Sequence, residues 1–158
     1  MGTFQLDFEM PRRLGCAYIG ADGQEHVPPV IHRALLGTFE RFLGILLEGT
    51  SGRLPAFMAP VQLRLVPVAD RHHAWAQALA AAVRAEGFRV ELAESNERVA
   101  AQVRDAVLRR VPLIGVIGDR EAADEAVSVR AADGADMGVI SRGVLLELLR
   151  RCCQPPEV

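Results

Sequence analysis

Strand and helix patterns alternate through the second two-thirds of this sequence. Four apolar runs have the length and residue types of strands: residues 61–66, 88–92, 113–117 and 126–130. Two segments between them, residues 73–86 and 97–110, carry apolar side chains at helical spacing, and Ser141 is placed to cap a further helix. Strands that alternate with helices predict a wound α/β sheet, and the turn signal Asp133–Gly134 predicts a hairpin near its end.

A connection rich in glycine, serine and proline, residues 49–55, precedes this region. Such composition is typical of a boundary between domains. Before it, residues 3–8 alternate polar and apolar side chains, which predicts a half-buried strand. Residues 14–19 are predicted to form a second strand that returns through a hairpin turn at residues 21–24. We therefore expect two parts: a small antiparallel piece with a helix (residues 1–54) and the α/β unit (residues 55–158).

Within the first part, residues 30–36 read as a short buried strand, and a helix is predicted to begin after Gly37. Thr38 is a natural N-cap, and apolar residues recur on one face of the helix: Phe39, Phe42, Leu43 and Leu46. Arg41 is unexpected, because a cation in the first turn lies at the unfavourable end of the helix dipole. Either a nearby carboxylate pairs with Arg41, or an anion such as a phosphate lies between it and the helix N-terminus.

The composition excludes several classes of protein. The 158 residues carry a formal net charge of −2, so there is no overall basic field to attract nucleic acid. The three cysteines form neither a disulfide framework nor a spaced metal motif. No apolar run reaches the roughly 18–20 residues that a membrane span needs, and the first residues lack the pattern of a signal peptide. A soluble, cytoplasmic protein is expected.

Few residues suggest chemistry on their own. His32 lies in an apolar strand, where a core histidine is more common than a metal ligand, and zinc needs four ligands. His72 and His73 read as a solvated helix entrance, and the pair Cys152–Cys153 as incidental. The loop at residues 95–98 opens a helix at the carboxyl edge of the predicted sheet, where ligands bind in such folds, although an ordinary capping loop fits equally well.

Several segments, taken in order and spacing, carry a specific resemblance. They are GTFQLDF (2–8), VIHRALLGTFERFLGIL (30–46), LPAFMAPVQ (54–62), NER (96–98), LRRVP (108–112), VIGDRE (116–121) and VSVR (127–130). Together they resemble the C-terminal portion of threonyl-tRNA synthetase, a class II aminoacyl-tRNA synthetase, from Gly2 to about Leu149. The resemblance implies a fold with two components. The first is the end of a class II catalytic domain with its motif 3 helix, and the second is a mixed-sheet α/β anticodon-binding domain.

The resemblance also implies roles for individual residues. Arg41 matches the catalytic arginine of motif 3 that contacts ATP phosphate, and Thr3 and Gln5 match positions of the adenylate pocket. His32 matches one of three protein ligands of a zinc ion that binds threonine. Asn96, Glu121 and Arg130 match positions that read anticodon bases. The implied activity is ligation of threonine to its tRNA through threonyl-adenylate, with ATP, Mg²⁺ and Zn²⁺, in a homodimeric enzyme.

Two departures from the family limit this expectation. The first two class II motifs, the other zinc ligands and the editing region do not occur in the 158 residues, so we expect the chain alone not to charge tRNA. From Val61 onward, thirteen arginines stand against fourteen acidic residues, a charge of −1. Binding to tRNA should therefore be weak unless the arginines cluster. The alternatives are a non-catalytic module that binds tRNA or a protein, and an interaction domain whose exposed strand edge completes another sheet.

Overall fold

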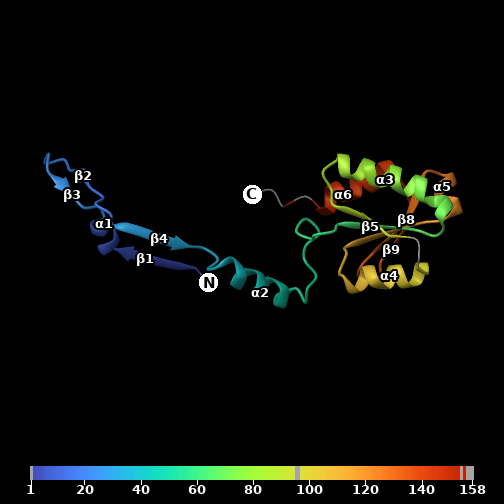
Figure 1. Ribbon diagram of the computed structural model, residues 1–158, viewed down its shortest axis with the longest axis horizontal. Helices are drawn as coiled ribbons and strands as arrows, with labels where there is room; N and C mark the ends of the chain where they lie inside the picture. The colour runs from blue at the N-terminus through green and yellow to red at the C-terminus, as the bar shows by residue number, and fades with distance from the viewer. Residues whose placement is uncertain (1, 95–96, 154, 156–158) are drawn as a thin grey trace. The chain divides into compact units, whose positions relative to one another are not determined.

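The computed structural model describes residues 2–94, 97–153 and 155. The chain forms two compact units, Met1–Gly49 and Thr50–Val158, and Figure 1 labels their elements. None of the described helices is long and apolar enough to cross a membrane.

The first unit contains two small antiparallel sheets and two helices. Its elements are β1 (Thr3–Asp7), α1 (Glu9–Arg13), β2 (Tyr18–Ile19), β3 (Glu25–His26), β4 (Val30–Ala34) and α2 (Phe39–Gly49). Strand β1 pairs with β4, and β2 pairs with β3 across the predicted turn. The predicted strand at residues 14–19 is mostly wrong: only Tyr18–Ile19 is extended. The chain first turns through α1, whose opening N–H groups are held by the Asp7 carboxylate.

Burial in the first unit is lower than the sequence predicts. Strand β4 was expected to be buried, but Ile31 is 58% exposed. Helix α2 buries none of its residues, and Phe39 on its apolar face is 70% exposed. The reason is architectural: a two-stranded sheet has two faces, and within the described part of this unit no second layer closes over either one.

The second unit is the predicted mixed α/β sheet. Its elements are β5 (Leu63–Pro67), the 3₁₀ turn η1 (Asp70–His72), α3 (His73–Ala85), β6 (Val90–Leu92), α4 (Val99–Leu108), β7 (Leu113–Ile117), α5 (Asp119–Ala123), β8 (Ala126–Ala131), β9 (Asp136–Ser141) and α6 (Arg142–Cys153). The strand order is β6-β5-β7-β8-β9. Strands β6, β5 and β7 are parallel, whereas β8 and β9 add an antiparallel hairpin. The fold class is confirmed. Helix α5, only five residues long, was not predicted.

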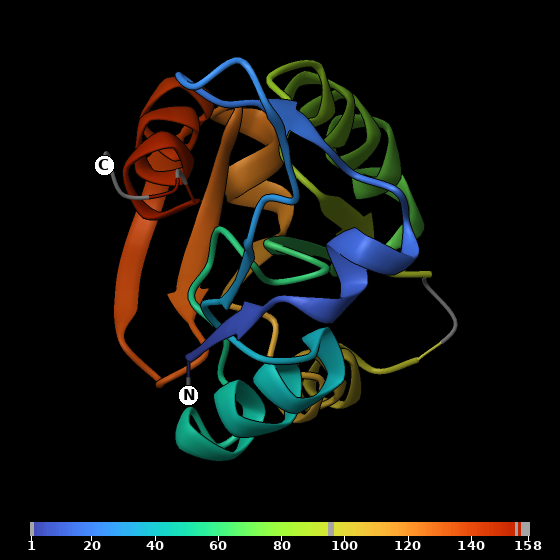
Figure 2. The same ribbon diagram turned by 90° about the vertical axis from the view of Figure 1, so that its left-hand side faces the viewer.

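Helices cover the two faces of this sheet unequally. Figure 1 and Figure 2 show α3 and α6 on one side and α4 on the other. The α3–α6 side contains the larger core, built from apolar residues of helices and strands: Leu63, Leu65, Leu79, Val83, Val127, Val129, Leu145 and Leu149. On the other side, α4 packs on Val66 and Ile114. The register places Arg130 beside Ile114 on this same face, yet Arg130 is exposed, as is Val139 at 58%. The α4 face therefore stays open over β8 and β9.

Candidate functional site

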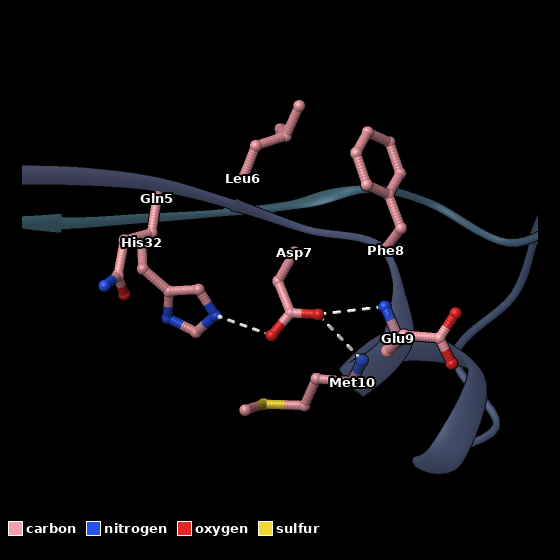
Figure 3. A pocket seen from close by; sticks show the side chains of 7 residues that line it. All are labelled: Gln5, Leu6, Asp7, Phe8, Glu9, Met10 and His32. Carbon is pink, nitrogen blue, oxygen red and sulfur yellow. Dashed lines mark hydrogen bonds and ion pairs between the residues drawn. The ribbon is translucent and has the colours of Figure 1, made fainter.

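The polar face of β1 and β4 brings two of the predicted site residues together. The antiparallel register sets Gln5 opposite His32. Because side chains alternate along a strand, both point to the same face of this small sheet. Figure 3 shows Gln5, Asp7 and His32 on one side of β1, while Leu6 and Phe8 point to the other. Gln5, Asp7 and His32 line one open hollow together with Met10.

Asp7 is a member of this face to which the sequence assigned no role. One carboxylate oxygen, Oδ1, accepts hydrogen bonds of 2.9 Å from the backbone N–H groups of Glu9 and Met10. The bond from Met10 and then that from Glu9 lower the pKa of Asp7 from its ordinary value. The other oxygen, Oδ2, lies 3.8 Å from Nε2 of His32 (Figure 3). The alternating pattern of residues 3–8 places Asp7 on the polar face and could have identified it.

The donor set around His32 does not make a complete zinc site. Zinc in proteins takes four ligands, three or four of which are side chains of the protein. Here one imidazole is accompanied by the Asp7 carboxylate, and among the described residues no group of three or more histidine, cysteine or acidic side chains could hold a metal ion. His32 can supply one ligand, and the remaining ligands would have to come from other groups.

Arg41 lies in the first turn of α2, as predicted. The Thr38 hydroxyl accepts a hydrogen bond of 3.3 Å from the Arg41 backbone N–H, which confirms Thr38 as the N-cap. The Arg41 side chain is exposed, and no carboxylate of the described residues pairs with it. The guanidinium is therefore available to an anion. Neither Arg41 nor Thr3 lines the hollow that contains Gln5 and His32.

Glu121 occupies the third position of α5, at the carboxyl end of β7. Its Oε2 accepts a hydrogen bond of 2.9 Å from the Gly118 backbone N–H, so the side chain is folded back over the helix start. The carboxyl edge of the sheet is where α/β folds bind ligands. Asn96, predicted to act with Glu121, lies outside the described residues.

A network that the sequence did not reveal stabilises this edge. Arg71 Nε and Nη2 donate to the two oxygens of Asp119 at 2.7 and 2.8 Å. His72 is only 2% exposed, so the expected solvated helix entrance is wrong for this residue. Its Nδ1 accepts from the Ala69 N–H, which leaves the ring proton on Nε2, 2.9 Å from Asp119 Oδ1. The hydrogen bonds from Arg71, and then that from His72, hold the pKa of Asp119 well below its usual range.

Arg130 lies on β8, beside the beginning of β7, whereas Glu121 lies beyond the end of β7. Arg130 pairs with Ile114 in the first half of β7. In the described part of the chain no hydrogen bond or ion pair joins the two. Arg130 Nη2 is 3.6 Å from Asp136 Oδ2 on β9, with more than half of each side chain exposed. Such an exposed pair contributes little stability, so the guanidinium can exchange this partner for a ligand.

Residues 62–151 of this open-faced unit match the family model described as the anticodon-binding domain. The chain belongs to this family. It is 42% identical, over 154 residues, to a threonine–tRNA ligase of Maridesulfovibrio salexigens, which covers 98% of this chain and 24% of that protein. A threonine–tRNA ligase of Symbiobacterium thermophilum is 48% identical over 86% of this chain and 21% of its own length.

A solved structure is similar over the same extent. The crystal structure of the RNA-binding domain of threonyl-tRNA synthetase from Cryptosporidium parvum Iowa II has a TM-score of 0.84 and 28% identity, covering 99% of this chain and 40% of that one. These comparisons confirm the resemblance to the C-terminal portion of threonyl-tRNA synthetase. The chain spans only 24% of the first ligase above, and membership of the family supports a role in tRNA recognition.

Proposed function

We propose that the second unit binds the anticodon of threonine tRNA, as part of an enzyme that ligates threonine to this tRNA in the cytoplasm. The observation that carries the proposal is the family match across residues 62–151, combined with an open sheet face that presents Arg130. Sequence-specific proteins commonly bind unstacked RNA bases, which side chains contact through hydrogen bonds and stacking. An arginine with a weak surface partner is suited to this contact, and Glu121 can accept hydrogen bonds from base edges. Asn96 is proposed to act with them.

The first unit would contribute part of the aminoacylation site. Arg41 is proposed to stabilise negative charge on ATP phosphate, an assignment supported by its exposure and the absence of a carboxylate partner among the described residues. Thr3 and Gln5 would line the adenylate pocket, and His32 would supply one zinc ligand. Such residues position the reactants and do not act as nucleophiles. Because the described donor set is incomplete, the 158-residue chain alone is expected not to form threonyl-adenylate.

A binding measurement tests the anticodon proposal directly. Fluorescently labelled threonine tRNA is titrated with the chain at 50 mM salt, beside a transcript that differs only in its anticodon. We expect tighter binding of the threonine anticodon, and Arg130→Ala should reduce this preference by roughly 5- to 150-fold, the range of one lost base contact of about 1–3 kcal/mol. Equal affinity for the two transcripts would contradict anticodon recognition. Threonyl-adenylate formation by the purified chain would contradict its expected inactivity.

A second function, a non-catalytic module in a complex with another protein, is favoured by one observation. The apolar face of β1 and β4 is exposed, including Phe4 at 69% and Leu6 at 52%. A contiguous apolar surface of this kind is typical of an interaction site. The same tRNA titration separates the two functions, because a module that binds only protein leaves both transcripts unbound at 50 mM salt. An assembled enzyme would be a homodimer, by its resemblance to the family.

A further inference from the structure

An arginine occupies a position at the end of α4 where glycine is the usual residue. The Val111 N–H donates to the Ala106 carbonyl at 3.0 Å, and the Arg110 N–H donates to the Val107 carbonyl at 3.1 Å. This pair of bonds defines a Schellman motif, in which the residue after the C-cap adopts a left-handed backbone. Arg110 has φ +59°, accordingly. A left-handed conformation is unfavourable for any residue with a Cβ, so Arg110 is retained at a cost in stability.

Arg110 lines a hollow of about 190 Å³ within the second unit. The charged residues of its lining are Arg53, Arg110 and Asp133, and both arginines are exposed. Neither arginine pairs with a carboxylate in the described ranges. Oδ1 of Asp133 accepts a hydrogen bond from the Ala135 N–H at 3.0 Å, which orients the carboxylate toward its own turn. The charged groups of the lining are therefore two arginines without a carboxylate partner in the described ranges and one carboxylate, a net charge of +1.

The hollow adjoins Arg130, the arginine proposed to contact anticodon bases. Its lining includes Ala131 and Ala132, the two residues that follow Arg130 in the chain. Ala132 is fixed at the sheet edge by donating its N–H to the Pro112 carbonyl at 2.9 Å. If an RNA base contacts Arg130, the sugar-phosphate backbone of that strand would therefore lie near this edge of the sheet. Successive phosphates of a single strand lie only a few ångströms apart, so a base contact and neighbouring phosphate contacts can be made together.

We propose that Arg53 and Arg110 form a phosphate-binding pair for the RNA backbone beside Arg130. This inference rests on the proposed tRNA-binding function. It assigns the electrostatic part of the affinity for tRNA to two named arginines. Guanidinium groups bind phosphate through paired, charge-assisted hydrogen bonds. Counterion release on such contacts supplies much of the affinity of proteins for RNA. The second unit has fourteen arginines and fourteen acidic residues, and so no net positive charge. It can still bind tRNA, because two arginines without a carboxylate partner among the described residues line one hollow at the edge that the RNA follows.

The salt dependence of tRNA binding tests this pair. The double variant Arg53→Ala/Arg110→Ala is compared with Arg142→Ala/Arg151→Ala, which removes two exposed arginines of α6. Affinity for threonine tRNA is measured between 50 and 200 mM salt. For two lost phosphate contacts, the slope of log K against log salt should become shallower by about 1.4, and affinity at 0.1 M salt should fall about 25-fold. The α6 variant should keep most of the slope of the unsubstituted chain.

The outcomes separate this inference from the proposed function. If the unsubstituted chain binds tRNA and the Arg53/Arg110 variant has the same slope of log K against log salt, the phosphate pair is overturned. The proposal that the chain binds tRNA would then still stand. An equal loss of tRNA affinity in the Arg53/Arg110 and Arg142/Arg151 variants would also overturn the phosphate pair, because affinity would then depend on net charge alone. If the unsubstituted chain does not bind tRNA at 50 mM salt, both proposals fail.

A single substitution distinguishes a binding role of Arg110 from a structural one. Arg110→Gly relieves the left-handed strain, so the thermal midpoint followed by Trp75 fluorescence should rise by about 3 °C. The same change removes one cation, so the salt slope should become shallower by about 0.7. A variant that is more stable but binds tRNA more weakly supports the inference. A rise in stability with unchanged binding would overturn the role of Arg110.

Discussion

Helices α2 and α3 share an amphipathic pattern, but only α3 is packed against other elements of its unit. Both are amphipathic, with apolar side chains at helical spacing. Helix α3 buries Ala76, Leu79, Ala80 and Val83 against the second unit's sheet. Helix α2 buries none of its eleven residues. The difference shows that a periodic apolar face specifies which side of a helix would be covered, whereas burial itself requires a second layer to pack against.

The same contrast extends to the two units. Pro11 is the one buried residue among residues 2–49 that the structure describes, whereas the second unit buries apolar residues on both faces of its sheet. Since hydrophobic burial is the main favourable contribution to folding, the two units should differ widely in local stability. The predictions below measure that difference.

The largest expected effect is in hydrogen exchange of the intact chain. Amides of β5 and β7 lie in the centre of the larger sheet and should exchange only by global unfolding of their unit, with protection of at least about 10⁴-fold. Amides of β1 and β4 should exchange within about 100-fold of the rate of an unfolded chain, because an isolated two-stranded sheet is marginally stable. Exchange mass spectrometry of the purified chain makes the comparison.

Comparable protection of β1 and β5 would contradict the contrast. If protection of β1 increases with protein concentration, a second copy of the chain covers the apolar face of Phe4 and Leu6. If β1 is protected equally at all concentrations, its stability arises within one chain.

An intermediate effect is expected from matched leucine truncations. Leu65→Ala removes a fully buried side chain from the core beneath α3 and α6 and should lower the free energy of unfolding by about 3 kcal/mol. Leu6→Ala removes a side chain that is 52% exposed and should change it by less than about 0.5 kcal/mol. Urea unfolding followed by the single tryptophan, Trp75, reports the second unit, because Trp75 packs against its core. Similar midpoints for the two variants would contradict this expectation.

The smallest effect concerns two carboxylates whose pKa values are lowered, Asp7 in the first unit and Asp119 in the second. A lowered pKa in the folded state stabilises the protein above the unfolded pKa of about 3.9, and this contribution is lost as the pH falls toward the folded value. Asp119→Asn should therefore lower the Trp75 thermal midpoint at pH 7, and the difference from the unsubstituted chain should shrink below about pH 4.

Asp7→Asn is the control for this titration. Its partners are the N–H groups of α1 and the ring of His32, all in the first unit. We expect Asp7→Asn to leave the thermal midpoint followed by Trp75 unchanged, both at pH 7 and below about pH 4. A difference for Asp119→Asn that stays constant from pH 7 to pH 3 would show that the network acts through geometry and not through the charge of Asp119.

Much of the fold follows from local patterns in the sequence. The strand at residues 113–117 was predicted with its observed bounds, Leu113–Ile117, because four apolar side chains surround Gly115 and the segment ends at Gly118–Asp119. The Thr38 cap of α2 was likewise predicted, because a threonine hydroxyl suits the first free N–H groups of a helix. Helix α5 was missed, since five residues are too few to show a helical period.

Less of the candidate site could be predicted. The family resemblance names Gln5, His32, Glu121 and Arg130, and their roles remain predictions. The pattern of residues 71–72 and 119 carries no sign of the Arg71–His72–Asp119 network, because its members are 47 and 48 residues apart in the chain. The Schellman geometry of Arg110 was also hidden, because arginine is not the residue that predicts a left-handed turn.

The sequence by itself determined the order of the longer strands and helices, the side of each that is apolar, and membership of the anticodon-binding domain family, whereas the five-residue helices α1 and α5 were missed. These properties depend on residue periodicity and on motifs that are local in the chain. Only the tertiary structure decided which apolar faces are buried and which arginines lack a carboxylate partner. Both depend on residues far apart in sequence: burial needs a second layer, and a cation is free only when no acidic side chain folds next to it. Arg41, Arg53 and Arg110 are among the arginines without such a partner in the described residues, and Arg53 and Arg110 also line one hollow.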